Sequence, residues 1–230
     1  MRTAAVLPVK SFGSAKERLG SALGAGSRQA LAQAMFLDVL ATLRRTPSID
    51  QIVIVASEPS VEFAADDRVV VLEDPHTEGQ STAAGIGIRW AMSSGFDRVL
   101  LVPGDTPLLS ADELGALLDG ATADGTAVVV IPDRHHTGTN GLLLHPPDAI
   151  APSFGPGSLE RHVQAAEAAR VSHRIERIPS LIYDVDTSDD LAVVAAAIED
   201  QHSAAPRTRG TLRQLERSGA RIRQPAGAGS

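Results

Sequence analysis

The fold of this chain is decided by one stretch, Val99-Leu100-Leu101-Val102-Pro103-Gly104-Asp105-Thr106-Pro107-Leu108-Leu109. Its apolar run contains β-branched residues and is followed at once by Pro-Gly, a pattern typical of a buried strand in a parallel sheet. In open α/β sheets, ligands bind outside the carboxyl ends of such strands. The turn after this strand therefore places the carboxylate of Asp105 where a ligand is expected.

Asp105 has two interpretations from this stretch alone. It could hold a metal ion against a phosphate, because Mg²⁺ takes one or two carboxylates together with phosphate oxygens. It could instead cap the helix predicted to begin near Ser110, or make an Asx-turn. Residues outside the stretch have to decide between the two.

Strands and helices alternate along the rest of the chain. Apolar and β-branched runs predict strands over residues 4–9, 51–56, 68–72, 127–131 and 142–144. Helical spacing predicts helices over residues 28–45, 82–93, 111–121, from 158 onward and 188–199, the last with Thr187 or Ser188 as N-cap. Residues 182–187 are expected to form a short last strand or a loop. This repetition of βαβ units predicts a single α/β domain over residues 1–200, with a mainly parallel central sheet flanked by helices.

Residues 201–230 differ in composition from the rest. They are rich in Ala, Pro, Arg, Gly and Ser, which cannot bury much apolar surface, so we expect a disordered basic tail. Six arginines and one glutamate fall in this segment, so the remainder is more acidic than the net charge of −7 indicates. Such a surface does not suit nucleic acid, and an anionic ligand would need a local cluster of cations or a metal ion.

Several common site types are missing from the sequence. There is no cysteine, which excludes disulfides, thiolate nucleophiles and thiolate zinc sites. Neither a Gly-x-x-x-x-Gly-Lys-Ser/Thr loop nor a Gly-x-Ser-x-Gly elbow occurs, and Gly85-Ile86-Gly87 lacks the third glycine of a dinucleotide fingerprint. The apolar start is stopped by Pro8, and no apolar run approaches about 18 residues. We expect a cytoplasmic protein without a membrane anchor.

Three cations follow the first predicted strand, namely Lys10, Lys16 and Arg18, with Gly13 between them. A lysine acts as a mobile point charge for phosphate, and loop amides add fixed donors. The position after a strand favours a polyphosphate-binding loop, although the same residues could form an exposed helix start.

Two further carboxylates, Asp184 and Asp186, lie two residues apart. Side chains alternate along an extended segment, so both would point to one side. With Asp105 they could bind one or two Mg²⁺ ions and neutralise a transferring phosphoryl or nucleotidyl group. Alternatively, Asp186 and Asp189 are helix-start carboxylates favoured by the helix dipole.

Two loops, at residues 137–140 and 155–158, are rich in hydroxyl groups, amides and glycine. The second opens a predicted helix, whose first amides form a ready anion site. Both loops could also be plain turns.

In chain order these motifs resemble the guanylyltransferases of coenzyme F-420 biosynthesis, which act on phosphoenolpyruvate or 2-phospho-L-lactate. The motifs are Leu7-Pro8-Val9-Lys10, Ala15-Lys16-Glu17-Arg18-Leu19, Pro103-Gly104-Asp105-Thr106-Pro107-Leu108, Pro132-Asp133-Arg134 with Gly138-Thr139-Asn140, Phe154-Gly155-Pro156-Gly157-Ser158 and Asp184-Val185-Asp186-Thr187. The resemblance runs from about Thr3 to Ala197. It implies a Rossmann-like, molybdopterin-guanylyltransferase-like nucleotidyltransferase that joins GTP to a three-carbon phosphate and releases pyrophosphate.

The resemblance also implies roles for individual residues. Catalysis would fall to Lys10, Lys16 and Asp105, acting by positioning and charge neutralisation while the acceptor phosphate attacks the α-phosphorus. Mg²⁺ would be held by Asp105, Asp184 and Asp186. The nucleotide would be bound by Leu7, Pro8, Val9, Lys10, Lys16, Gly79, Ser81 and Gly104, and the acceptor by Thr139, Asn140, Gly155 and Ser158.

Some alternatives stay open at this point. Relatives often show Gly-Leu-Asn where this chain has Gly79-Gln80-Ser81, so the base or ribose contact there is undecided. The Ala- and Arg-rich composition resembles actinobacterial relatives that use phosphoenolpyruvate, but composition does not fix the acceptor, and a homodimer is neither indicated nor excluded. A metal-dependent glycosyltransferase using a nucleotide sugar would also carry Asp-x-Asp, and a non-catalytic nucleotide-binding module would bind GTP without turnover.

Overall fold

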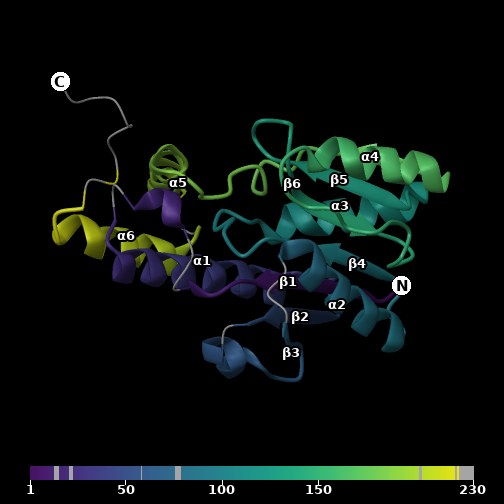
Figure 1. Ribbon diagram of the computed structural model, residues 1–230, viewed down its shortest axis with the longest axis horizontal. Helices are drawn as coiled ribbons and strands as arrows, with labels where there is room; N and C mark the ends of the chain where they lie inside the picture. The colour runs from purple at the N-terminus through teal and green to yellow at the C-terminus, as the bar shows by residue number, and fades with distance from the viewer. Residues whose placement is uncertain are drawn as a thin grey trace.

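The computed structural model describes residues 1–12, 16–20, 23–57, 59–75, 79–201, 204–220 and 222. Within these residues the chain forms a seven-stranded sheet with helices on both faces (Figure 1). The strands are β1 (Thr3–Val9), β2 (Gln51–Ala56), β3 (Val69–Glu73), β4 (Arg98–Leu101), β5 (Val128–Pro132), β6 (Thr139–Leu144) and β7 (His173–Ile175). The helices are α1 (Ala25–Arg45), α2 (Gln80–Ser93), α3 (Ala111–Asp124), α4 (Ser158–Ala169), α5 (Ser188–Asp200) and α6 (Pro206–Arg217), with short 3₁₀ segments η2 (Glu17–Leu19) and η3 (Pro59–Ala64).

The predicted α/β class with a mainly parallel sheet is confirmed. The strand order is β3-β2-β1-β4-β6-β5-β7, and β1 pairs in parallel with both β2 and β4. The stretch that opened the sequence analysis forms β4 near the middle of this order. The short edge strand β7 was not predicted, and residues 182–187 form a loop rather than a strand.

Consecutive residues of the central strands pack into two separate hydrophobic cores, one on each face of the sheet. On β1, Leu7 faces the core shared with α1 and α3, whereas its neighbour Val6 faces the core shared with α2 and α4. On β4, Leu100 and Leu101 divide in the same way. Because helices cover both faces of the sheet, consecutive residues of these strands are apolar in the sequence.

The strand β6 runs against its neighbours. It pairs antiparallel with β4 and with β5, with Leu142 opposite Leu101. Its beginning therefore lies at the edge where the parallel strands end. This reversal brings Thr139 and Asn140, predicted to lie in a loop, into the first two positions of a strand beside the turn that carries Asp105.

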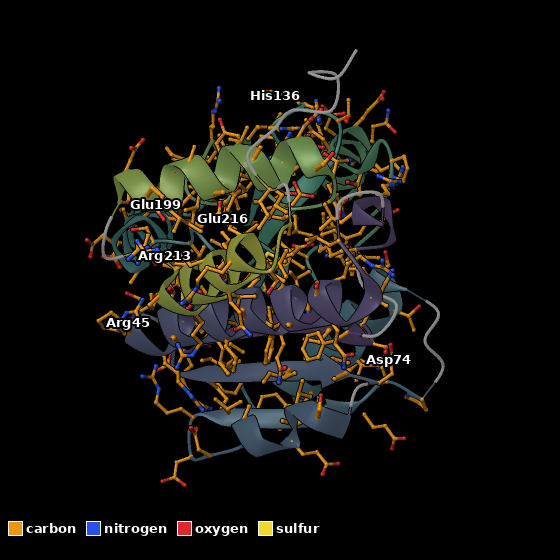
Figure 2. All side chains as sticks on the ribbon, turned by 90° about the vertical axis from the view of Figure 1, so that its left-hand side faces the viewer. Arg45, Asp74, His136, Glu199, Arg213 and Glu216 are labelled. Atoms are coloured by element: carbon orange, nitrogen blue, oxygen red, sulfur yellow. The ribbon has the colours of Figure 1, made fainter. Side chains whose placement is uncertain are left out.

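The prediction of a disordered tail is wrong for residues 206–217, which form α6. Figure 2 shows this helix between α5 and α1, on the side of the molecule to the left in Figure 1. Leu212 and Leu215 of α6 are buried in a third core with Leu31 and Met35 of α1 and Leu191 of α5. Residues 202, 203, 221 and 223–230 of the same tail lie outside the described residues.

The start of α6 is held by a carboxylate from α1. Asp38, which is 3% exposed, accepts hydrogen bonds from the backbone amides of Arg207 (3.2 Å) and Thr208 (2.8 Å). Asp38 thus takes the place of an N-cap side chain, because residue Ala205 at that position has no polar side chain. The position of α6 is set by a residue far away in the sequence, which composition could not reveal.

No helix among the described residues is both long enough and apolar enough to cross a membrane.

Replacing Gly87 with alanine is expected to destabilise the fold by about 1–3 kcal/mol, the usual cost of overpacking. A Cβ on this residue of α2 would overlap Cγ1 of Val6 and lie 2.9 Å from its Cγ2, inside a packed core. Urea unfolding measures the change. Gly85→Ala is the matched control: on the same helix its Cβ meets only the flexible end of Arg89 at 3.4 Å, so we expect no loss and a gain of up to about 1 kcal/mol. Equal effects of both substitutions would contradict the close approach of α2 to β1.

Candidate active site

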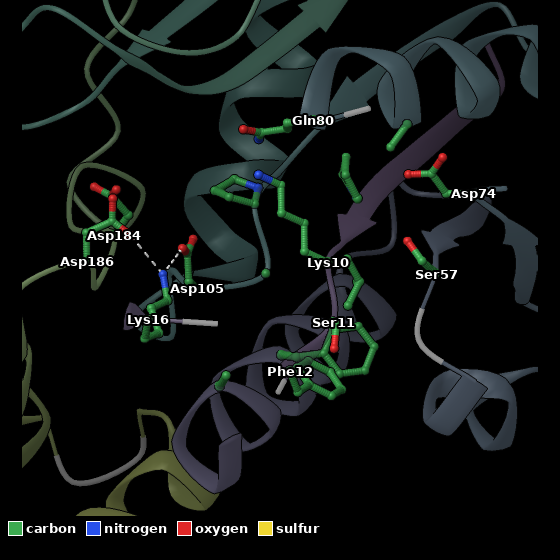
Figure 3. A pocket seen from close by; sticks show the side chains of 18 of the residues that line it. Lys10, Ser11, Phe12, Lys16, Ser57, Asp74, Gln80, Asp105, Asp184 and Asp186 are labelled. Atoms are coloured by element: carbon green, nitrogen blue, oxygen red, sulfur yellow. Dashed lines mark hydrogen bonds and ion pairs between the residues drawn. The ribbon is translucent and has the colours of Figure 1, made fainter. Parts of the chain in front are cut away.

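A pocket of about 700 Å³ lies at the edge of the sheet where the parallel strands end (Figure 3). Its wall is built from the end of β1, from the segments that follow β1, β2, β3 and β4, from α1, from the starts of α2 and β6, and from the loop before α5. The lining residues are Pro8, Val9, Lys10, Ser11, Phe12, Lys16, Ala32, Phe36, Ser57, Asp74, Gly79, Gln80, Ala83, Pro103, Gly104, Asp105, Thr139, Asn140, Asp184 and Asp186. This is the position at which open α/β sheets bind their ligands, and its volume suits a nucleotide.

At one end of the pocket an ammonium group lies between carboxylates. Nζ of Lys16 forms an ion pair with Asp105 and a second one, at 3.0 Å, with Asp186. The Lys16 side chain is only 8% exposed. Although burial works to lower the pKa of Lys16, the charges of Asp105 and Asp186 hold it above its ordinary value. Lys16 is therefore a permanent positive charge in the pocket.

The backbone of Lys16 is itself unusual. Its φ of +60° lies in the left-handed region, which a residue with a Cβ adopts at a cost. The side chain of this residue makes the two ion pairs with Asp105 and Asp186. Residues 13–15 of the loop before it lie outside the described residues, and Arg18, the third predicted cation, does not line the pocket.

The loop with Asp184 and Asp186 is fixed against the turn of Asp105. The backbone amide of Val185 donates to the carbonyl of Asp105 at 3.2 Å, and the Val185 side chain is fully buried. The two flanking carboxylates are thereby turned to the pocket, as the alternation of side chains predicts. Asn140 joins the group by donating from Nδ2 to Oδ1 of Asp184 at 3.1 Å.

The surroundings of Asp184 oppose its ionisation. Burial, followed by the negative charges of Asp105 and Asp186, raises its pKa to about 6. In addition, Oδ1 of Asp105 is buried without a hydrogen-bond partner. An excess of negative charge and an unpaired buried oxygen are what a bound cation would relieve, so the donor set suits Mg²⁺. As placed, however, no three Asp, Glu or His side chains among the described residues form a metal cluster, and the ammonium group of Lys16 lies between Asp105 and Asp186.

Asp190 holds the backbone next to Asp186. Its Oδ2 accepts from the amides of Asp186 (3.2 Å) and Thr187 (2.7 Å), and its Oδ1 pairs with Arg134 at 2.6 Å. With Thr187 it forms a capping box at the start of α5, which confirms Thr187 as the N-cap. The sequence interpretation missed Asp190 and Arg134 as supports, although Thr187-x-x-Asp190 is the pattern of a capping box.

The alternative role of Asp105 as a helix cap is wrong. The N-cap of α3 is Ser110, whose hydroxyl accepts from the amide of Glu113. Asp105 instead uses one oxygen for Lys16 and leaves the other unpaired. Its carboxylate is thus free of any structural hydrogen bond to the backbone of the described residues.

The opposite end of the pocket is formed by Ser57 after β2 and Asp74 after β3, with Lys10 between them and the carboxylates (Figure 3). Phe12 and Phe36 add an apolar wall, with ring centroids 5.7 Å apart. The sequence interpretation missed these four residues. A signal for Ser57 was present, because it is the first polar residue after the predicted strand 51–56, whereas Asp74 follows β3 only because that strand extends to Glu73.

Most of the residues that the resemblance assigned to the site meet in this pocket, but four of them do not line it. Leu7 is fully buried in the core beneath the pocket, since its side chain points to the face covered by α1 and α3. Ser81 accepts a hydrogen bond from the amide of Phe154 at 2.8 Å. Ser158 is buried behind Thr139, with its Oγ 3.1 Å from Thr139 Oγ1, and Gly155 lies beside Arg161.

The fold of this chain also occurs in solved structures of other proteins. The same fold occurs in a protein of Desulfovibrio desulfuricans G20 assigned to the nucleotide-diphospho-sugar transferases, with a TM-score of 0.76, 18% identity and coverage of 94% of this chain and 96% of that one. It also occurs in a nucleotidyl transferase from Methanothermobacter, with a TM-score of 0.60, 18% identity and coverage of 87% and 99%.

The family follows from the sequence comparison. The model of the guanylyl transferase CofC-like family matches residues 3–218, and the chain belongs to this family. A phosphoenolpyruvate guanylyltransferase of Conexibacter woesei is 44% identical over 95% of this chain and 98% of its own length. A 2-phospho-L-lactate guanylyltransferase of Methanothermobacter thermautotrophicus is 32% identical, with 88% of each chain covered. The predicted resemblance is thereby confirmed, and the match extends through α6.

Proposed function

We propose that this protein transfers GMP from GTP to phosphoenolpyruvate and releases pyrophosphate, as a step of coenzyme F-420 biosynthesis. The observation that carries the proposal is the group of Lys16, Asp105 and Asp186 at the end of a pocket of nucleotide size. Phosphoenolpyruvate is favoured over 2-phospho-L-lactate because the relative with 44% identity bears the former name and the one with 32% the latter.

The reaction needs no protein nucleophile, because the phosphate oxygen of the acceptor attacks the α-phosphorus of GTP and pyrophosphate leaves. Lys10 and Lys16 place two ammonium groups along the pocket, where they would neutralise the charge of the triphosphate. The end with Phe12, Ser57 and Asp74 is left for the nucleoside. Because the lining residues sit on strand ends, both reactants would be held in a fixed orientation, which lowers the entropic part of the barrier.

We assign Asp105, Asp184 and Asp186 as the residues that would hold Mg²⁺. When bound, Mg²⁺ supplies charge neutralisation at the transferring nucleotidyl group. The assignment is supported by the unpaired Oδ1 of Asp105 and by the raised pKa of Asp184.

The test is to incubate the protein with GTP and Mg²⁺ and to follow pyrophosphate release with each acceptor in turn. We expect release with phosphoenolpyruvate, none with pyruvate, which lacks the attacking phosphate, and loss of activity when Mg²⁺ is removed by a chelator. Faster release with 2-phospho-L-lactate would reassign the acceptor. No release with either phosphate compound would contradict the proposed function.

A further inference from the structure

A buried histidine stands directly behind the pocket wall. His162 of α4 is 0% exposed and lies edge-on to Phe154, with ring centroids 5.3 Å apart. Its Nε2 is 2.8 Å from the backbone nitrogen of Ser153. A backbone N–H can only donate, so Nε2 is the acceptor and carries no proton. Burial, followed by the charge of Arg161, lowers the pKa of His162 to about 4, which keeps the ring neutral near pH 7.

The single ring proton is therefore on Nδ1, and it points to Thr139. Nδ1 of His162 lies 3.0 Å from Oγ1 of Thr139, which must act as the acceptor. The hydroxyl of Ser158 donates to the same oxygen at 3.1 Å. A hydroxyl oxygen has two acceptor positions and one hydrogen. With both acceptor positions filled from behind, the Thr139 hydroxyl hydrogen remains for a partner on the pocket side.

We propose that His162 is a positioning residue that fixes the Thr139 hydroxyl as a donor to an anionic oxygen of the bound acceptor. This inference rests on the proposed function and names the group of the substrate that the wall recognises. Thr139 and its neighbour Asn140 both line the pocket, and Asn140 donates a hydrogen bond to Asp184. The Thr139 hydroxyl can donate its hydrogen to the pocket but has no free acceptor position. It therefore suits a phosphate or carboxylate oxygen of the ligand and disfavours a ligand hydroxyl that has to donate.

Two substitutions of His162 separate this role from a merely structural one. In His162→Asn the side-chain amide stands where Nδ1 was and keeps a donor for Thr139, but nothing reaches Ser153. In His162→Gln the amide oxygen stands where Nε2 was and keeps the acceptor for Ser153, but the donor to Thr139 is lost. We expect His162→Gln to raise KM for phosphoenolpyruvate about three- to tenfold, the range for one hydrogen bond, with KM for GTP unchanged. We expect His162→Asn to stay within about twofold of the wild type.

Substitutions of Thr139 complete the test. Thr139→Val removes the hydroxyl and should raise the same KM, and Thr139→Ser should restore it. In the double variant with His162→Gln, Thr139→Val should add little, because both changes remove one interaction. The positioning role is overturned if His162→Gln and His162→Asn give the same KM for phosphoenolpyruvate. It is also overturned if the effects of His162→Gln and Thr139→Val on this KM add fully in the double variant.

A measurement without substrate keeps this inference separate from the proposed function. Nitrogen NMR of ¹⁵N-histidine-labelled protein, with His162→Gln to assign the signal, reports which ring nitrogen carries the proton. We expect protonated Nδ1 and unprotonated Nε2. Protonation of Nε2 would overturn the inference even in an active enzyme, whereas the expected tautomer in a protein that releases no pyrophosphate would contradict only the proposed function.

Discussion

Replacing Asp105 with asparagine is expected to lower kcat for pyrophosphate release by about a hundredfold or more, the scale found when one electrostatic contact to a transition state is removed. The substitution keeps the size of the side chain but removes the charge that faces Lys16 and that would hold Mg²⁺. Steady-state kinetics at saturating GTP and phosphoenolpyruvate measure the loss.

The fold should survive this change. Oδ1 of Asp105 has no partner to lose, and Lys16 keeps its ion pair with Asp186. We therefore expect the thermal midpoint to stay within a few degrees of the wild type, a shift that corresponds to about 1 kcal/mol. Asp112→Asn is the matched control, because Asp112 is an exposed carboxylate in the first turn of α3, outside the pocket. A rate close to wild type for Asp105→Asn would remove Asp105 from the catalytic group.

Deleting all residues after Asp200 is expected to destabilise the protein by about 3–6 kcal/mol, since burial of each leucine of α6 is worth about 1.5–3 kcal/mol. The deletion would expose Leu31 and Met35 of α1. It would also leave the buried carboxylate of Asp38 without the two amides that it caps. Urea unfolding followed by circular dichroism measures the loss.

Single substitutions on α6 refine this test. Leu212→Ala should cost about 2–5 kcal/mol, the usual range for a buried leucine. Arg213→Ala, one residue further along, should cost less than about 1 kcal/mol, because its side chain is 56% exposed and its pair with Glu199 lies at the surface. An unchanged unfolding midpoint in the truncated protein would mean that α6 contributes nothing to the stability of the fold.

The parts of the fold that the sequence predicted were those with strong local signals. The apolar run before Pro103-Gly104 identified β4, and the rule for strand ends placed Asp105 at the pocket. Alternation along the chain was enough to pair Asp184 with Asp186, although that segment is a loop, because the buried Val185 between them turns both outward.

The parts that the sequence did not predict depend on contacts between distant residues. The composition around α6 indicated disorder, whereas Asp38 of α1 supplies the missing cap and Leu212 and Leu215 supply the apolar face. A weak local signal existed in Pro206 at the first turn and in the spacing of the two leucines. His162 carried no signal, because its contact with Thr139 exists only where α4 lies behind the start of β6.

Because β6 runs in the reverse direction, the pocket has two parts that come from different elements. The residues of one part can change in evolution without changes in the other. The parallel strands β1, β2 and β3 contribute Lys10, Ser57 and Asp74, whereas β6 and α4 contribute Thr139 and the residues behind it. On the proposed assignment, nucleotide contacts belong to the first part and acceptor contacts to the second. A lineage could therefore exchange one three-carbon phosphate for another by substitutions in β6 and α4 alone, without altering how it recognises GTP.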